Sequence, residues 1–295
     1  MSPDLVLTLL AAVLAAGTPL VLAGLGELVA ERAGVLNLGL EGMMLMGAVC
    51  GFAACVESGS IAVGFAASIG AGITLSALFA ALVIGFLANQ VVAGLALTLF
   101  GAGLSAMIGL DYTAATIDPL PPLLAGLDGI LLASLLLAAG VATMLTRTKT
   151  GLVLRAVGDA PVAAHALGYR VRLIKLGAIV FGGAMAGLAG GYLSLVYTPL
   201  WAEGMTAGRG WIALALVVFA VWHPGKLVLG AFLFGGFTIA QLHAQTLGLA
   251  LPAELLSALP YLATIVAVVV LARRVGVHES TPATLGKAYH PRLEN

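Results

Sequence analysis

The chain has 295 residues, of which 61% are hydrophobic and only 9% are charged, and its mean hydropathy is +1.12. A soluble domain carries about 25% charged residues, so this composition excludes an ordinary water-soluble protein and predicts an all-α protein that crosses the membrane several times. The net charge is +0, so only the distribution of charge along the chain is informative.

Apolar segments separated by short polar connections fill the first half of the chain. Their lengths predict membrane spans at about 5–28, 36–56, 61–87, 91–110 and 129–145. The second span is expected to be broken early, at Gly39, Glu41 and Gly42, and Asn89 separates the third span from the fourth. The first residues lack the basic start of a cleavable signal peptide, so the first span is expected to be a retained helix.

A basic connection at 147–175 follows the fifth span. It holds six of the thirteen Lys and Arg, and only Asp159 opposes them. The pattern predicts a short helix at 162–167, with Asp159 as its N-cap, Pro161 in its first turn and Gly168 at its end. A short amphipathic helix on the membrane surface indicates that a soluble partner docks here.

The second half of the chain continues the same plan. Further spans are predicted at about 176–197, 227–247 and 255–271, whereas the apolar segment 209–221 is too short to cross alone, because a span needs about twenty residues. The tail, 273–295, is polar. About nine transmembrane segments result, within a range of eight to ten.

The distribution of Lys and Arg predicts the orientation. With the 147–175 connection in the cytoplasm, twelve of the thirteen basic residues fall on the cytoplasmic side, and Arg209 is the exception. The N-terminus is then outside and the C-terminus is cytoplasmic. The expected location is the plasma membrane.

A weak internal repeat relates residues 37–48 to residues 205–216, and it sets Glu41-Gly42 opposite Arg209-Gly210. In the predicted topology the two stretches cross the membrane in opposite directions. Inverted repeats with glycine-interrupted helices point to a transport pathway near the bilayer midplane. The sequence thus predicts a single transmembrane permease-like domain at 1–272, with a first repeat at about 28–110 and a second at about 199–272.

Polar residues inside apolar segments are the candidate site residues, because they are costly in a membrane and need a reason. We select five as candidates for a substrate pathway: Asn37, Glu41, Asn89, Arg209 and Trp211. Asn37 and Glu41 could line the pathway or cap a helix, and Asn89 could simply end one. Trp211 could stack on a sugar or base, or lie at the membrane interface. The five His are dispersed, so no metal site is expected.

Three stretches, 26–42, 150–171 and 211–236, resemble the permease subunits of bacterial ABC importers in the ribose and branched-chain amino acid permease superfamily. The pattern Leu-Arg-Ala-Val-Gly-x-x-Pro-x-Ala-Ala within 150–171 is the most specific of them. The match is closer to the branch for simple sugars and purine nucleosides, which a basic-membrane-protein-type binding lipoprotein serves. The resemblance covers about 20–272.

The resemblance implies that the basic connection is a coupling loop, whose helix docks on a separate ATPase subunit. The residues implied in docking are Arg155, Gly158, Asp159, Pro161, His165 and Gly168. The chain has no GxxxxGK[ST] motif, so ATP and Mg would be bound by the ATPase and this chain would be a transport subunit without a cofactor, not an enzyme.

The resemblance also implies a second, longer permease and an extracytoplasmic substrate-binding protein. Both a heterodimer and a homodimer remain open. The expected substrate is a nucleoside or a related small polar solute, such as a simple sugar or nucleobase, and no nucleic acid partner is expected. The alternative is a self-contained, ion-coupled secondary transporter, for which Glu41 is the only strong candidate for a deep acidic residue.

Overall fold

The computed structural model describes residues 3–121, 123, 127–246, 262 and 281–289, and this part of the chain is almost entirely helical. Seven of its helices are long and apolar enough to cross a membrane, which confirms the predicted all-α polytopic fold. They are α1 (Pro3–Arg32), α2 (Leu40–Ser58), α3 (Ile61–Ala80, extended by the π-helix Ala81–Gly85), α4 (Gln90–Gly109, followed by the 3-10 turn Leu110–Tyr112), α5 (Gly129–Arg147), α8 (Val171–Tyr192, extended by the π-helix Leu193–Tyr197) and α10 (Pro224–Thr246).

Three shorter helices complete the described part: α6 (Lys149–Asp159), α7 (Pro161–Ala166) and α9 (Arg209–Phe219). Helix α9 corresponds to the apolar segment that was predicted to be too short to cross alone. The last predicted span, 255–271, lies outside the described residues except for residue 262. Of the polar tail, the structure describes residues 281–289.

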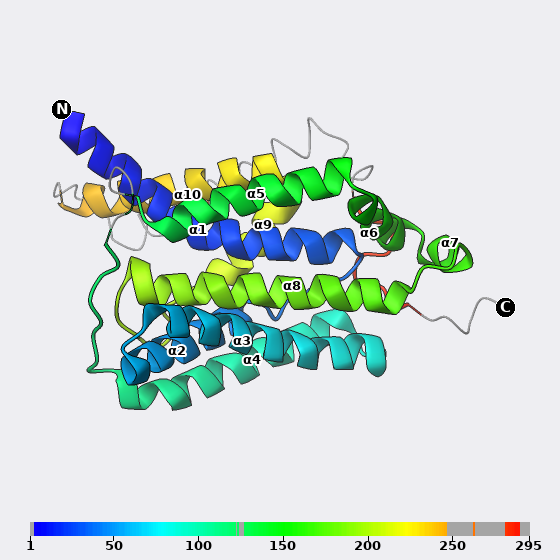
Figure 1. Cartoon of the computed structure of the whole chain (residues 1–295), viewed down its shortest axis with the longest axis horizontal. Coiled ribbons are helices and arrows are strands. Elements are labelled where there is room, and N and C mark those ends of the chain that lie inside the picture. Colours follow the sequence, from blue (N-terminus) through cyan, green and yellow to red (C-terminus); the bar gives the residue numbers. More distant parts are fainter. Residues whose placement is uncertain (1–2, 122, 124–126, 247–261, 263–280, 290–295) are drawn as a thin grey trace.

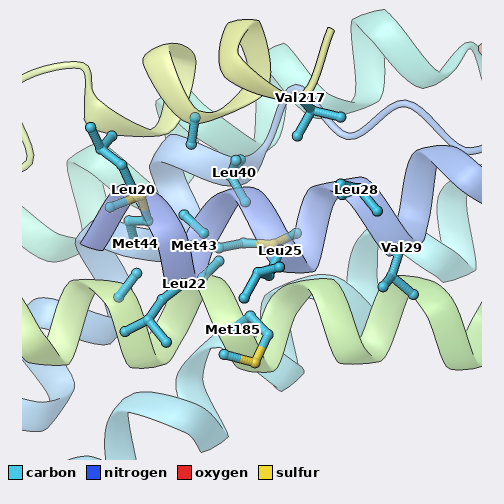
Figure 2. Close-up of a cluster of buried hydrophobic side chains, with 14 of the residues drawn as sticks. Leu20, Leu22, Leu25, Leu28, Val29, Leu40, Met43, Met44, Met185 and Val217 are labelled. Carbon is cyan, nitrogen blue, oxygen red and sulfur yellow. The ribbon is translucent and has the colours of Figure 1, made fainter. Parts of the chain in front are cut away.

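The long helices lie side by side, with α1, α2 and α8 in the middle of the bundle (Figure 1). Helix α8 packs against α1, α2 and α3, while α9 and α10 cover α1 and α4 covers α2. Figure 2 shows the core between these helices, where Leu25 of α1, Met43 of α2 and Met185 of α8 are buried. This core fixes the positions of the polar residues described below.

Glycines let the central helices approach closely. A Cβ atom at Gly47 of α2 would overlap the backbone of Gly187 on α8, and a Cβ atom at Gly187 would overlap the backbone of Ser68 on α3. Small residues at such crossings are typical of helix packing in membranes, where close van der Waals contact replaces the hydrophobic effect. Glycines at these crossings therefore serve the packing of the bundle.

Helices α6 and α7 project from one end of the bundle, and residues 281–289 lie at the same end (Figure 1). We call it the basic end, because residues 147–175 carry six of the thirteen Lys and Arg. The start of α1 and the connection between α4 and α5 lie at the opposite end (Figure 1).

Candidate functional site

Helix α2 begins inside the bundle rather than at its basic end. The side chain of Gln90, the first residue of α4, accepts a hydrogen bond from the Leu36 N–H at 2.8 Å, and the Thr98 hydroxyl donates to the Leu38 carbonyl at 2.8 Å. Thr98 lies eight residues, or about 12 Å, along α4 from Gln90. Residues 33–39 therefore run into the bundle without forming a helix.

The break in this segment ends before Leu40. The Asn37 side chain accepts a hydrogen bond from the Gly39 N–H at 3.0 Å, and α2 is continuous from Leu40 onward. The prediction that Glu41 and Gly42 interrupt the helix is thus wrong. Both lie in its regular first turn, because the local turn at Asn37 already satisfies the backbone before the helix starts.

The carboxylate of Glu41 caps the start of α9. One of its oxygens accepts the Thr206 hydroxyl at 2.5 Å and the Gly208 N–H at 2.9 Å, and the other accepts the Gly210 N–H at 2.6 Å. The first N–H groups of a helix lack partners within the helix and carry a partial positive charge, so a carboxylate is a favourable cap. The N-terminal ends of α2 and α9 therefore meet inside the bundle.

Helix α9 spans only part of the bundle. It starts beside Glu41, and after its last turn the Trp222 indole donates to Glu31 of α1 at 2.5 Å. Its eleven residues cover about 16 Å. The preceding residues, 198–208, reach α9 from the opposite end, where Trp201 packs on Gly109 of α4.

Arg209 and Trp211 lie in the first turn of α9. The Arg209 guanidinium donates to the Met205 carbonyl at 3.1 Å and lies 5.7 Å from the centroid of the Tyr197 ring, which is within the range of a cation–π contact. The Trp211 side chain is 37% exposed. Since Glu41 binds the residues on either side of Arg209, the structure brings these three predicted residues together.

The two asparagines are placed differently from one another. Asn37 is buried next to α2, and its backbone N–H donates to Glu27 at 3.0 Å. Asn89 is exposed at the basic end, where its side chain accepts the N–H groups of Val91 and Val92 and caps α4. Asn89 therefore caps α4 and takes no part in the contacts between α2 and α9.

Sequence reasoning missed two buried acids, Glu27 and Glu31, which are one turn apart on α1. Each accepts one hydrogen bond through one oxygen, and the other oxygen of each has no hydrogen-bond partner among the described residues. The statement that Glu41 is the only strong deep acid is thus wrong. The sequence analysis placed a break near Glu31, whereas α1 continues to Arg32. The spacing of four residues between Glu27 and Glu31, which places both on the same face of a helix, was the available signal.

The turn between α9 and α10 is strained and tied to α1. Val221 and Trp222 both have φ of +52°, which is unfavourable for side chains with a Cβ and most of all for a β-branched one. The Trp222 indole bonds Glu31, and the Trp222 carbonyl accepts Arg32 at 3.1 Å. These contacts hold the turn against the end of α1.

The basic connection forms two helices, as the sequence partly predicted. The Thr148 hydroxyl caps α6 by accepting the Gly151 N–H at 3.2 Å, and Pro161 lies in the first turn of α7 as predicted, although α7 spans Pro161–Ala166 rather than 162–167. The N-cap prediction for Asp159 is wrong, because α6 continues through Asp159 and Ala160 takes the N-cap position. Gly168 has φ of +88° and follows α7, which confirms it as the end of that helix.

The other predicted coupling residues lie along these two helices. Arg155 is half-buried on α6, and His165 is exposed on α7. Gly158 is buried against the backbone of Arg32, so a side chain would not fit there. Its carbonyl accepts both the N–H and the hydroxyl of Thr284, at 3.1 and 2.6 Å. Gly158 thus joins the coupling segment to the end of α1 and to residues 281–289.

In the described ranges, no group of three or more His, Cys, Asp or Glu is arranged to hold a metal ion. Cys50 and Cys55 are free thiols on α2. The arrangement therefore consists of helix ends, buried acids and a basic surface segment. Such a site can bind, orient and move, but it offers no evident nucleophile with an adjacent base.

Comparison with known proteins identifies the chain's family. TsgC13 of Haloferax volcanii, provisionally named a glucose ABC transporter permease protein, is 38% identical over 97% of this chain and 98% of its own length. The guanosine ABC transporter permease protein NupQ of Bacillus subtilis is 33% identical over 77% of this chain and 79% of its own. The nucleoside ABC transporter permease protein NupC of Lactococcus lactis is 29% identical over 94% and 92%. No solved structure matches the chain significantly.

Residues 9–271 match the family described as "Branched-chain amino acid transport system / permease component". This range contains the described long helices apart from the start of α1, together with the α2–α9 junction and the coupling segment. The chain therefore belongs to this family and is a multi-pass permease subunit of an ABC importer, a transport subunit rather than an enzyme.

Proposed function

We propose that this permease subunit carries a nucleoside or a related small polar solute, such as a simple sugar or nucleobase. The names of its relatives support this class, since they refer to guanosine, nucleosides and glucose. These solutes share a sugar-sized ring with several hydroxyl groups or a flat base. A pathway for them needs a few hydrogen-bonding groups and an aromatic face rather than a deep charged site.

The observation that carries the proposal is the meeting of α2 and α9 at Glu41. Two non-helical segments, 33–39 and 198–208, enter the bundle from opposite ends, and each leads into a helix. This arrangement supports the inverted repeats and a pathway beside the junction. Trp211 would then offer a stacking face, Arg209 would offer hydrogen bonds, and Glu41 would hold the start of α9 in place.

Helices α6 and α7 would dock on the ATPase, with the basic end in the cytoplasm. The N-terminus would be outside and the C-terminus inside, in line with the basic residues. Movement of α6 would reach the segment 33–39 directly, because Gly158 packs against Gly34. ATP hydrolysis in the partner would thereby act on the segment that leads into α2.

The remaining partners follow from the same scheme. A second, longer permease would pair with this chain as a heterodimer, so that each contributes half of the pathway. A substrate-binding protein would dock at the opposite end of the bundle, where α4 and α5 are connected. The pairing would place two coupling segments on two ATPase subunits, which is what alternating access driven by ATP requires.

The test is coexpression of this chain with its genomic neighbours, purification, and transport in proteoliposomes. We expect an ATPase and a longer permease to copurify, and uptake of guanosine or a simple sugar to require ATP and the binding protein. Uptake by this chain alone, driven by an ion gradient, would instead support a secondary transporter. If this chain is the permease of an ABC importer, Trp211→Ala should change uptake without changing recovery of the ATPase.

A further inference from the structure

Lys175, in the second turn of α8, is a buried cation without a partner. Its side chain is only 4% exposed, and neither a hydrogen bond nor an ion pair joins its ammonium group to any described residue. Lysine is almost never buried unless it is paired, because removing its charge from water is unfavourable. Within the described ranges nothing neutralises this ammonium group, so it can accept a counter-charge from a docked molecule.

Lys175 lines a cavity of about 700 Å³ at the basic end. One wall is the start of α7, at Pro161 and Ala163, and the opposite wall is the segment 281–289, including Lys287. A smaller cavity behind it is lined by Lys175, Lys287 and Arg172 of α8. Asp159 is the single acid among the residues that line the two cavities. The site is therefore predominantly basic.

The wall formed by 281–289 is firmly attached to the bundle. Thr284 makes two hydrogen bonds to the Gly158 carbonyl, and the Gln90 side chain donates to the Lys287 carbonyl at 3.1 Å. The side chain of Tyr289 packs on a small core formed by α6, α7 and α8. Residues 281–289 and α7 thus form one continuous surface with a built cavity between them.

We propose that this cavity receives an acidic side chain of the ATPase subunit, whose carboxylate pairs with Lys175. The inference rests on the proposed docking of α6 and α7 on that subunit. The basic connection needs an acidic partner surface, since it carries six basic residues against one acid. Pro161, Ala163 and Ala166 of α7 line the cavity, and its volume has room for an acidic side chain.

This pairing would give the ATPase a second point of contact with the permease. Contact through α7 reaches the bundle through its packing on α6 and on the start of α8, whereas Lys175 belongs to α8 itself, the helix that packs against α1, α2 and α3. A carboxylate held by Lys175 therefore transmits force directly to the central helix. Residues 281–289 become part of the docking surface rather than a solvated tail.

The first experiment compares Lys175→Met, which keeps the length of the side chain, with Lys175→Arg, which keeps the charge. Lys226→Met is the matched control, because Lys226 is an exposed lysine in the first turn of α10, outside the cavity. The readouts are the affinity of the purified permease for its ATPase and the thermal stability of the permease without the ATPase.

We expect Lys175→Met to weaken ATPase binding roughly thirtyfold or more, because one partner of a buried charge pair is lost. Lys175→Arg should restore much of the binding, and Lys226→Met should bind like the parent. The isolated Lys175→Met permease should be as stable as the parent or more so, since it loses an unpaired buried charge. A loss of stability with unchanged ATPase affinity would assign Lys175 a purely structural role and overturn the proposal.

A photo-crosslinking residue at Ala288, which lines the cavity, identifies the occupant. We expect a crosslink to an ATPase peptide that contains Asp or Glu, and charge exchange between that acid and Lys175→Glu should restore binding. Crosslinking to lipid alone would overturn the proposal. If the parent permease itself does not retain the ATPase, the proposed docking of α6 and α7 fails; if the parent and Lys175→Met bind equally, only the cavity assignment fails.

Discussion

Replacing Glu41 with alanine tests the junction between α2 and α9. Three donors, the Thr206 hydroxyl and the N–H groups of Gly208 and Gly210, would lose their acceptor inside the bundle. A hydrogen bond to a charged group contributes about 1.5–3 kcal/mol. We therefore expect Glu41→Ala to lower the free energy of unfolding by about 4 kcal/mol, allowing for incomplete additivity. Transport should fall as well, because the start of α9 is no longer held.

Glu41→Gln is the matched control. Its side-chain oxygen can still accept the Thr206 and Gly208 hydrogen bonds, so only the bond to Gly210 is lost and the effect should be about 1–2 kcal/mol. Both variants can be measured in detergent by unfolding monitored through tryptophan fluorescence. The order of stability should be the parent, then Glu41→Gln, then Glu41→Ala.

A double-mutant cycle with Thr206→Val makes the prediction refutable. In the parent, Thr206→Val should lower the free energy of unfolding by about 1–2 kcal/mol. In the Glu41→Ala background it should have almost no effect, because the hydrogen bond from Thr206 to Glu41 is already absent. Equal costs of Thr206→Val in the two backgrounds would refute the assignment of Glu41 as the acceptor. So would a Glu41→Ala variant that unfolds like the parent.

Three further substitutions follow from the packing and the basic end. Gly187→Ala should lower the free energy of unfolding of the permease by about 1–3 kcal/mol through overpacking. Gly177→Ala on the same helix meets open space and should be neutral or slightly stabilising. Equal effects of the two substitutions would contradict the packing argument. Glu31→Leu should lower the free energy of unfolding by about 1–3 kcal/mol because it leaves the Trp222 indole without its acceptor, and Glu31→Gln should lower it less. Unfolding monitored by tryptophan fluorescence measures both variants, and equal losses of stability would argue against the Glu31–Trp222 contact. Arg155→Glu should weaken copurification of the ATPase while membrane insertion stays intact, and undiminished copurification would count against the coupling assignment.

Much of the fold could be predicted because its signals are local. Apolar length predicts the long helices, and Pro161 and Gly168 mark the ends of α7 through their own backbone preferences. The short apolar segment 209–221 indicated a helix that does not cross alone, and α9 is such a helix. Each of these signals is contained within a few neighbouring residues.

The site was harder to predict because its contacts join distant parts of the chain. Glu41 and Thr206 are 165 positions apart, and Glu31 and Trp222 are 191 apart. No local pattern shows which donor a buried carboxylate will meet. Asp159 was misjudged for a related reason: Asp is a good N-cap in general, but the preceding helix continues through it. The repeat at Glu41-Gly42 and Arg209-Gly210 was the one sequence signal for residues that do meet.

The dependence of α9 on Glu41 has a consequence for biogenesis. The ribosome completes Glu41 long before Thr206, and at about 5–20 residues per second the 165 intervening residues take roughly 8–33 s. During this time the carboxylate lacks the three donors that it binds in the folded bundle, and an unpaired charge within a membrane segment opposes insertion of that segment. Helix α9, with eleven residues, is in turn too short for independent recognition as a span. The packing of α2 into its final position and the insertion of α9 therefore occur together, late in synthesis. The insertion machinery must retain α2 until the second half of the chain has been made.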